Sequence, residues 1–336
     1  MTIQPDNQHW HVAGDGAIGL SLGHLLQRGG ARVALLVRRS QEARSLHYRD
    51  VDGPWLEWDC PRTDRPRGES IERLVVATKA YSVGEVMGRW SGSLAPGARV
   101  FLFNNGIHEL PVPSTPPDVR RLIVVNSGFA AYLEAPGRVV QSARAPIWIG
   151  DGTATSVPGC PRAREDIAFL DACGCHARWT PDIESLRWLK VAVNAVINPL
   201  TVMHECRNGA LVRKPGVPAL VRELCAESGS VLQAMGIPYD GERIHQEVLA
   251  VIEATAANRS SMLQDHARGD GRNELEHING ALVRRGSDLG IGMAAHRSVL
   301  ERASRMFAGR PGVQPASARS TSSSISTTGP SAGSMS

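Results

Sequence analysis

The chain has 336 residues, 42% hydrophobic and 21% charged, which is room for about two globular domains. Its formal net charge of +4 comes from arginines spread along the chain and nearly matched by acidic residues, so no nucleic-acid partner is indicated. No stretch approaches the ~20 apolar residues of a bilayer crossing, and "MTIQPDNQHW" lacks the blocks of a secretory signal. We therefore expect a cytoplasmic protein without nucleic-acid or membrane partners.

The first predicted unit is "HWHVAGDGAIGLSLGHLLQRGGARVALLVRRS", residues 9–40, which runs strand, glycine turn, helix, strand. A lone G-x-G-x-x-G is weak evidence, but in this context it is typical of dinucleotide binding. Gly14 permits the tight turn, Gly16 lets a pyrophosphate approach, and Gly19 lets helix and strand pack closely. The residues expected to hold the cofactor here are Gly14, Gly16, Ala17, Ile18 and Gly19. A structural glycine turn without a ligand is the alternative.

The end of the second strand indicates which nicotinamide cofactor is bound. An NAD site places an acidic residue there, whereas this chain has Arg38 and Arg39, which suit a 2′-phosphate. NADP(H) is therefore predicted. The alternative is that both arginines only face solvent.

Further strands are predicted at 73–78, 99–104, 121–126 and 145–150, with helical segments between some of them. After about residue 180 the β-rich runs give way to helical patterns, at 217–236, at 243–257 and from Glu274 onward. We predict an α/β fold, a Rossmann-type doubly wound sheet domain (1–180) followed by a mostly α-helical substrate domain (181–310). The tail, 311–336, is rich in Ser, Gly, Pro and Thr and is predicted to be disordered.

The six cysteines have no paired C-x-x-C spacing; the nearest pair is "CGC" at 173–175. We interpret them as free thiols and expect no metal site.

The segment "WLKVAVNAVINPL", 188–200, carries Lys190, Asn194 and Asn198 four residues apart in an apolar helix. This spacing puts all three on one stripe, where each unpaired buried group costs about 1–3 kcal/mol. Neighbouring backbone or buried water is the structural explanation; a ligand is the functional one. Only three of the 37 basic residues are lysine, which marks Lys190 and Lys79 as candidates for giving up a proton.

Several motifs together resemble the ketopantoate reductase (2-dehydropantoate 2-reductase) family over most of residues 9–305. They are "GDGAIG" (14–19), Arg38, "TKAYSV" (78–83), "NNGI" (104–107), "KVAVNAVINPLT" (190–201), "NGAL" (208–211), "SSMLQD" (260–265) and "NELEHING" (273–280). The resemblance implies NADPH-dependent reduction of a 2-keto acid, ketopantoate to pantoate, in pantothenate and coenzyme A biosynthesis.

The resemblance also implies roles for individual residues. Lys190 would be the general acid, which fits a partly desolvated lysine of lowered pKa. Asn194 and Asn198 would orient the substrate, and Asn105 would lie near both nicotinamide and substrate. Lys79 would lie beside the cofactor. Ser261 would contact the substrate carboxylate and Glu274 its hydroxyl group.

The sequence departs from the family pattern at three places. His108 stands where the second glycine of the turn is expected, the link from Ser261 to Glu274 is one residue longer, and Asn273 replaces Thr. Plainer roles remain open for some of these residues: a helix cap for Ser260 and Ser261, a solvated acid for Glu274, and surface positions for His108 and Lys79.

Two other functions are therefore kept: a reductase of the same architecture for another 2-keto acid, and a non-catalytic NADP-binding redox sensor. Either a monomer or a homodimer is compatible with the sequence.

Overall fold

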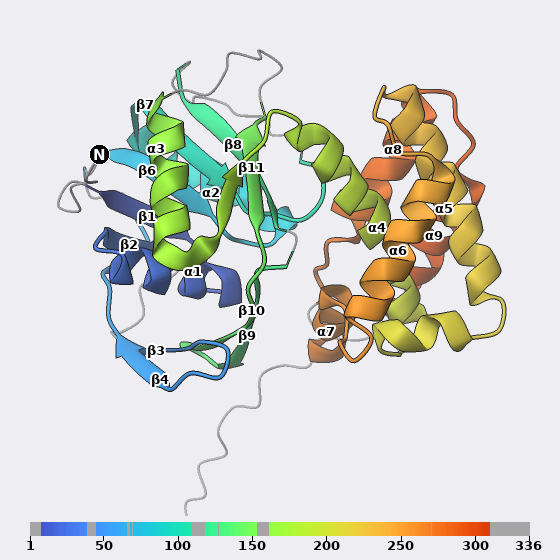
Figure 1. Cartoon of the computed structure of the whole chain (residues 1–336), viewed down its shortest axis with the longest axis horizontal. Coiled ribbons are helices and arrows are strands. Elements are labelled where there is room, and N and C mark those ends of the chain that lie inside the picture. Colours follow the sequence, from blue (N-terminus) through green and yellow to red (C-terminus); the bar gives the residue numbers. More distant parts are fainter. Residues whose placement is uncertain are drawn as a thin grey trace, which may run out of the picture.

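The computed structural model describes residues 8–38, 45–65, 68, 70–108, 118–126, 128–152, 161–269 and 271–309. Its strands gather on one side of the molecule and helices α4 to α9 on the other (Figure 1). The α/β fold with a Rossmann-type sheet and a following helical part is thus confirmed. The last strand ends at Trp179 and α4 begins at Ile183. The boundary at residue 180 stays a prediction, and Arg39 and the Ser-rich tail lie outside the described residues.

The large sheet has the order β12-β11-β8-β7-β6-β1-β2-β5. Its strands are β1 (His9–Ala13), β2 (Arg32–Leu36), β5 (Arg62–Thr63), β6 (Ile71–Val76), β7 (Leu94–Leu102), β8 (Arg120–Asn126), β11 (Ile147–Asp151) and β12 (Ala177–Trp179). All pairs are parallel except β8 with β11. The predicted strands of the N-terminal unit and those near 73–78, 99–104, 121–126 and 145–150 are confirmed, with shifted ends.

Helices cover both faces of this sheet, because its strands are apolar on both sides. Helix α2 (Val83–Trp90) packs on one face, and α1 (Ala17–Arg28) and α3 (Pro161–Leu170) pack on the other. A buried ion pair also attaches α3: Asp166, which is fully buried, accepts hydrogen bonds from Arg73 at 2.6 Å and Arg99 at 2.5 Å. Short helical turns complete the connections at η2 (Ala80–Ser82), η3 (Ser91–Ser93) and η4 (Asp171–Cys175).

A second sheet of order β4-β3-β10-β9 was not predicted from the sequence. Its strands are β3 (Leu46–Arg49), β4 (Trp55–Trp58), β9 (Ala130–Ala135) and β10 (Arg138–Ala143). It covers the outer side of α1, where the His24 ring stacks on Tyr48 with 4.1 Å between centroids. Helix α1 is thereby enclosed between two sheets.

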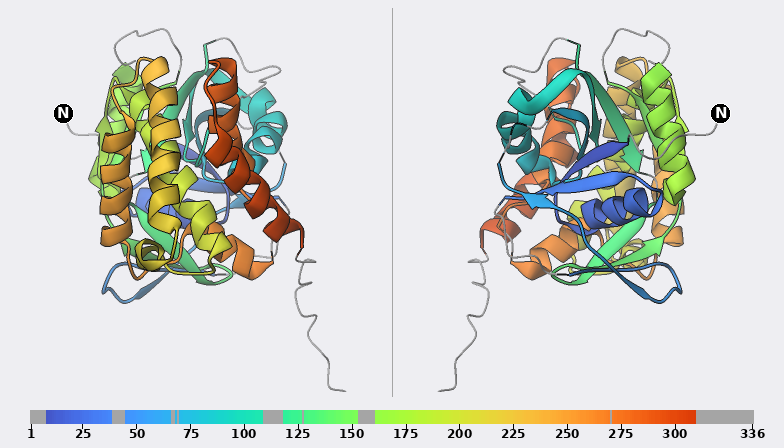
Figure 2. Two further views of the ribbon diagram at one scale, coloured as in Figure 1. Left: turned by 90° about the vertical axis from the view of Figure 1, so that its right-hand side faces the viewer. Right: turned by 90° about the vertical axis from the view of Figure 1, so that its left-hand side faces the viewer.

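The C-terminal part is built from helices around α4, the longest in the described chain. They are α4 (Ile183–Met203), η5 (Asn208–Arg213), α5 (Val217–Ala234), α6 (Gly241–Ala254), α7 (Ser261–Arg268), η6 (Glu276–Gly280), α8 (Ala281–Asp288) and α9 (Ala294–Ala308). Figure 2 shows the same arrangement from two sides. The start of α4 packs on the large sheet through Ile183 against Ile123 and Val125, and its remainder forms the core of the helical part. No described helix combines the length and apolar character that spanning a bilayer requires.

Proline interrupts the backbone hydrogen bonding of α4 without ending the helix. Pro199 has no N–H, so the carbonyl of Ala195, four residues earlier, loses its helical donor. The side chain of Asn279, from η6, donates to that carbonyl at 2.8 Å. A side chain more than 80 residues away therefore satisfies a group that the sequence of α4 leaves unpaired.

Candidate active site

The glycine turn lies where the order of the large sheet reverses. The chain passes from β1 through α1 to β2, and later returns to β6 on the other side of β1. The carboxyl ends of strands at such a switch point are the usual place for a ligand in doubly wound sheets. Gly14 has φ +120°, and a Cβ on Gly19 would collide with the Gly14 carbonyl oxygen. Gly14 therefore shapes the turn, and Gly19 lets the start of α1 lie close against it.

The N-terminus of α1 is suited to a phosphate group. Gly16 is the N-cap and has no atom within 4 Å of the place where its Cβ would stand, so a ligand can approach the backbone. Ala17 and Ile18 follow as the first residues of α1, whose first N–H groups have no helical partner. The first turn of α1 contains no acidic residue, and Asp15 is exposed. These features fit the pyrophosphate of a dinucleotide.

Arg38 follows β2 at the same edge of the sheet. Its guanidinium is about half exposed, donates to the Ser82 hydroxyl at 2.5 Å and lies 3.8 Å from a carboxylate oxygen of Glu85. The side chain is thus positioned over the start of α2 and still accessible to an anion. This arrangement fits a 2′-phosphate.

The loop after β7 runs from Asn104 to His108 and contacts the helical part. The Asn104 amide bonds the Thr78 carbonyl at the end of the neighbouring β6, and Asn105 donates to Glu274 at 3.4 Å. Gly106 has φ +82°, and a Cβ there would collide with the backbone of His277. The left-handed position in the loop is thus Gly106, and His108 does not have positive φ. His108 instead packs beside His277, with 5.3 Å between ring centroids, and burial lowers its pKa to about 3, with help from Arg187 and His277.

Lys190 lies on α4, three residues after Arg187 and partly buried, where the charge of Glu274 acts on its amine. Burial lowers the pKa of its amine to about 8, although the nearby charge of Glu274 raises it. In the part of the chain that the structure describes, the amine makes no hydrogen bond or ion pair. A lysine in this state can release a proton near neutral pH.

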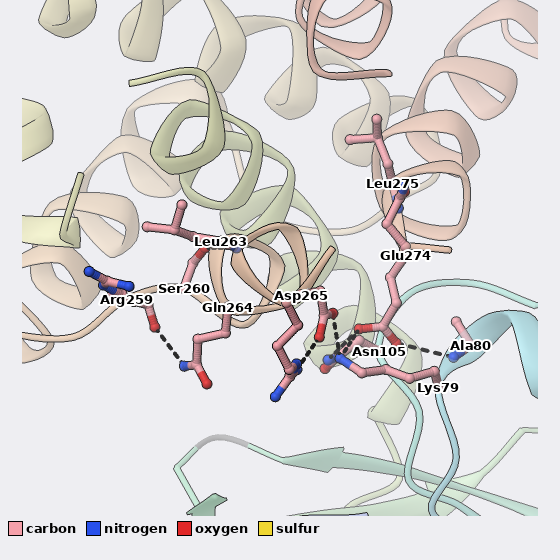
Figure 3. Close-up of polar contacts among 12 residues, drawn as sticks. Lys79, Ala80, Asn105, Arg259, Ser260, Leu263, Gln264, Asp265, Glu274 and Leu275 are labelled. Carbon is pink, nitrogen blue, oxygen red and sulfur yellow. Dashed lines mark hydrogen bonds and ion pairs between the residues drawn. The ribbon is translucent and has the colours of Figure 1, made fainter. Parts of the chain in front are cut away.

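Glu274 connects the two halves of the molecule (Figure 3). It is 4% exposed and accepts a hydrogen bond from the backbone N–H of Ala80 at 3.1 Å. Lys79 pairs with Asp265 at 2.7 Å and lies 3.5 Å from Glu274. Burial lowers the pKa of Lys79, but Glu274 and Asp265 outweigh it and raise the pKa overall. The solvated position considered for Glu274 is therefore wrong.

The remaining predicted substrate residues lie on α4 and α7. Asn194 is partly buried and Asn198 is 6% exposed, and within the described chain neither side-chain amide has a hydrogen-bond partner. Ser261, the first residue of α7, is exposed. The helix cap is its neighbour Ser260, which accepts from the Leu263 N–H at 3.0 Å and contacts Thr201 of α4 at 2.6 Å. The substrate contact of Ser261 stays a prediction.

Sequence reasoning missed three residues that shape this region: Asp265, Asn279 and Arg187. Asp265 ends the quoted "SSMLQD", and Asn279 lies in "NELEHING", so both motifs were found without these roles. Arg187 precedes Lys190 by three residues on the same face of α4, and its guanidinium donates to the Gly106 carbonyl. Helical spacing alone marks Arg187 as a neighbour of Lys190.

A glycine turn at a switch point, a helix N-terminus suited to a phosphate group and a partly buried lysine of lowered pKa are typical of a dinucleotide-dependent oxidoreductase. Comparisons with known proteins agree. The family models described as ketopantoate reductase PanE/ApbA and its C-terminal domain match residues 10–154 and 182–306. The chain belongs to the ketopantoate reductase family.

Individual relatives extend over nearly the whole chain. A 2-dehydropantoate 2-reductase of Vibrio cholerae is 40% identical over 290 residues, covering 83% of this chain and 91% of that protein. One from Archaeoglobus fulgidus is 32% identical over 298 residues, covering 87% and 96%.

Solved structures share the fold. A PanE/ApbA family ketopantoate reductase from Ralstonia eutropha JMP134 has a TM-score of 0.79 at 22% identity, covering 90% of this chain and 99% of that one. D-mandelate dehydrogenase with NADH and anilino(oxo)acetate also has a TM-score of 0.79, at 18% identity, with coverage of 90% and 98%.

Family membership confirms the predicted class: the protein is an NADP-dependent oxidoreductase acting on a CH–OH group. A non-catalytic redox sensor is set aside for this reason. The roles of individual residues stay predictions.

Proposed function

We propose that this protein reduces ketopantoate (2-dehydropantoate) to pantoate with NADPH, and so acts in pantothenate biosynthesis. The observation that carries the proposal is the state of Lys190. Its amine is desolvated, has a pKa of about 8 and makes no bond within the described chain, while Glu274 and Asn105 lie on the facing elements. The relatives named 2-dehydropantoate 2-reductase support this substrate.

In this proposal the residues divide the work of binding and proton transfer. The turn at Gly14 to Gly19 and the N-terminus of α1 hold the pyrophosphate, and Arg38 holds the 2′-phosphate. When bound, the nicotinamide supplies a hydride to the keto carbon. Lys190 donates a proton from Nζ to the keto oxygen, which becomes the hydroxyl of the product, and is reprotonated from solvent.

Side-chain amides and carboxylates around Lys190 orient the substrate. Asn194 and Asn198 offer unused donors and acceptors on the stripe that carries Lys190. Glu274 accepts a hydrogen bond from the substrate hydroxyl group, and Ser261 contacts the carboxylate. Lys79 lies beside the cofactor and holds Glu274 and Asp265 in place.

Replacing Lys190 tests the mechanism. In Lys190→Ala we expect kcat with ketopantoate to fall by at least about 100-fold, because general acid catalysis typically contributes 10²–10⁴-fold. The dissociation constant for NADPH, followed by nicotinamide fluorescence, should stay within about twofold of that of the unmodified enzyme, since the amine is not a cofactor ligand in this scheme. Near-normal turnover would remove Lys190 as the proton donor.

A related 2-keto acid is the second candidate substrate. The observation that favours it is His108, the last residue of the loop that carries Asn105, which packs against His277 where the family pattern expects glycine. A panel of 2-keto acids assayed with NADPH separates the candidates by kcat/KM. A value for another acid at least tenfold above that for ketopantoate would replace the first proposal with the second.

A further inference from the structure

The loop Asn104 to His108 is held between α4, which carries Lys190, and η6, which begins two residues after Glu274. On one side the Ile107 N–H donates to the His277 carbonyl of η6 at 2.9 Å. On the other side the Gly106 carbonyl accepts from Nη2 of Arg187 at 3.3 Å and from Nε at 3.4 Å. The carbonyl and the N–H of the peptide between Gly106 and Ile107 are thus bonded to different elements, the carbonyl to α4 and the N–H to η6.

The loop packs tightly against η6. Gly106 has φ +82°, and a Cβ there would collide with the His277 carbonyl, so the loop already touches η6 with bare backbone. Along this contact the loop can move only away from η6, and Arg187 bonds the Gly106 carbonyl of the loop from α4. The guanidinium of Arg187 therefore adds to the hydrogen bonds of Asn104 and Ile107 that hold the loop in place.

Burying the Arg187 side chain costs free energy, because its charged guanidinium loses contact with water. It is 15% exposed, and burial lowers the pKa of its guanidinium, partly offset by Glu184, whose carboxylate lies 3.5 Å away and is itself about half exposed. Glu184 offsets only part of the cost of desolvating the Arg187 guanidinium. The hydrogen bonds from the guanidinium to the Gly106 carbonyl offset a further part, because they involve a charged donor. Surface solvation alone would favour an extended, exposed arginine at this position.

We propose that Arg187 is a positioning residue of the active site. It stands three residues before Lys190 on α4, so one helix carries both the proton donor and the group that holds the loop. The loop in turn places Asn105 against Glu274, whose charge acts on Lys190. The inference rests on the proposed function, because it assigns Arg187 to the assembly of that same site.

The kinetic experiment uses Arg187→Ala in the full chain, with Arg284→Ala as the matched control. Arg284 also donates to a backbone carbonyl of η6, that of Glu276 at 3.1 Å, but is 57% exposed and away from the loop. We expect kcat of Arg187→Ala to fall by about 10- to 100-fold, since a displacement of about 1 Å can cost 10²-fold. KM should change less than kcat, and added guanidinium ion should restore part of kcat in Arg187→Ala alone. Equal kcat in both variants, or no response to guanidinium, would overturn the proposal.

A second readout does not depend on the substrate. In hydrogen exchange followed by mass spectrometry, the peptide that contains Ile107 should exchange at least about tenfold faster in Arg187→Ala than in Arg284→Ala. Unchanged exchange there would overturn the positioning role even in an active enzyme. If the unmodified protein does not reduce ketopantoate but the exchange rate rises as expected, the proposed function fails and the role of Arg187 in holding the loop stands.

Discussion

Burial and the carboxylate of Glu274 shift the pKa of Lys190 in opposite directions. Desolvation lowers the pKa to about 8, and Glu274 raises it. The same carboxylate also raises the pKa of Lys79, which is paired with Asp265 and therefore stays charged. Two lysines around one acid thus have different protonation behaviour, and only Lys190 titrates near neutral pH.

The first prediction at this scale concerns pH. A general acid must be protonated, so kcat/KM for reduction should fall as pH rises through about 8. Replacing Glu274 with Gln removes the charge that favours the ammonium form, so the alkaline limb should move to lower pH. Rates measured from pH 6 to 10 would show this. An alkaline limb that stays in place, or moves upward, contradicts the coupling of Glu274 to Lys190.

Arg38 decides between the two nicotinamide cofactors in our account. Arg38→Ala should weaken NADPH by about 10- to 100-fold, because a hydrogen bond to a charged group is worth about 1.5–3 kcal/mol. NADH, without the 2′-phosphate, should change by less than about threefold. Ser82→Ala, which removes a partner of Arg38 but keeps the guanidinium, is the control and should bind NADPH normally. Equal losses for both cofactors would reject the 2′-phosphate contact.

At the scale of elements, α4 lacks one backbone hydrogen bond, and a side chain from η6 replaces it. Pro199 leaves the Ala195 carbonyl without a backbone donor, and Asn279, which is fully buried, supplies one from η6. The segments "AVINPL" (195–200) and "HING" (277–280) are therefore joined by one hydrogen bond. This contact also fixes η6, which holds the loop of Asn105 through His277.

The prediction for this contact is a coupling between two substitutions. Asn279→Ala should lower the free energy of unfolding by about 1–3 kcal/mol, because it leaves a buried carbonyl unpaired. In Pro199→Ala the backbone N–H returns, so the same change should cost at least about 1 kcal/mol less. Urea unfolding of the four proteins measures the cycle. Additive effects would show that Asn279 does not compensate for Pro199.

Elements of the N-terminal unit were predictable because their signals are local. The turn at Gly14 to Gly19 lies between a strand and an amphipathic helix, and each part shows its own period. The second sheet was missed for the opposite reason. Strand β3 alternates in burial but has only four residues and pairs with β10, about 90 residues away. The equally short β4 exposes two successive residues, so it lacks the alternation of a half-buried strand.

At the scale of the whole molecule, the burial of histidines makes the fold sensitive to acid. His24, on the side of α1 that the second sheet covers, has its pKa lowered from 6.5 to about 4 by burial and by Arg28. His296, packed between helices, is also lowered to about 4, chiefly by burial. Because these histidines bind protons more readily in the unfolded chain, the stability that they contribute is present above about pH 6.5 and is lost as pH falls toward 4.

His24 provides the test of this behaviour. Its shift corresponds to about 3 kcal/mol at 1.36 kcal/mol per unit, so His24→Phe should remove about that much of the stability lost between pH 7 and 4. Tyr48→Phe, which keeps the imidazole, is the control and should leave the pH dependence unchanged. Urea unfolding at several pH values gives both. An unaltered pH dependence in His24→Phe would contradict a buried neutral imidazole.

The sequence by itself determined the nucleotide-binding unit, the sheet followed by helices, and the row of Lys190, Asn194 and Asn198. These follow from backbone dihedrals and from periods of 2 and 3.6, which act over a few residues. Only the tertiary structure decided that Glu274 lies near both Lys79 and Lys190. It also decided that Arg187 donates hydrogen bonds to the Gly106 carbonyl. Such contacts join segments 80 to nearly 200 residues apart, and the desolvation that tunes Lys190 exists only once those segments have packed together.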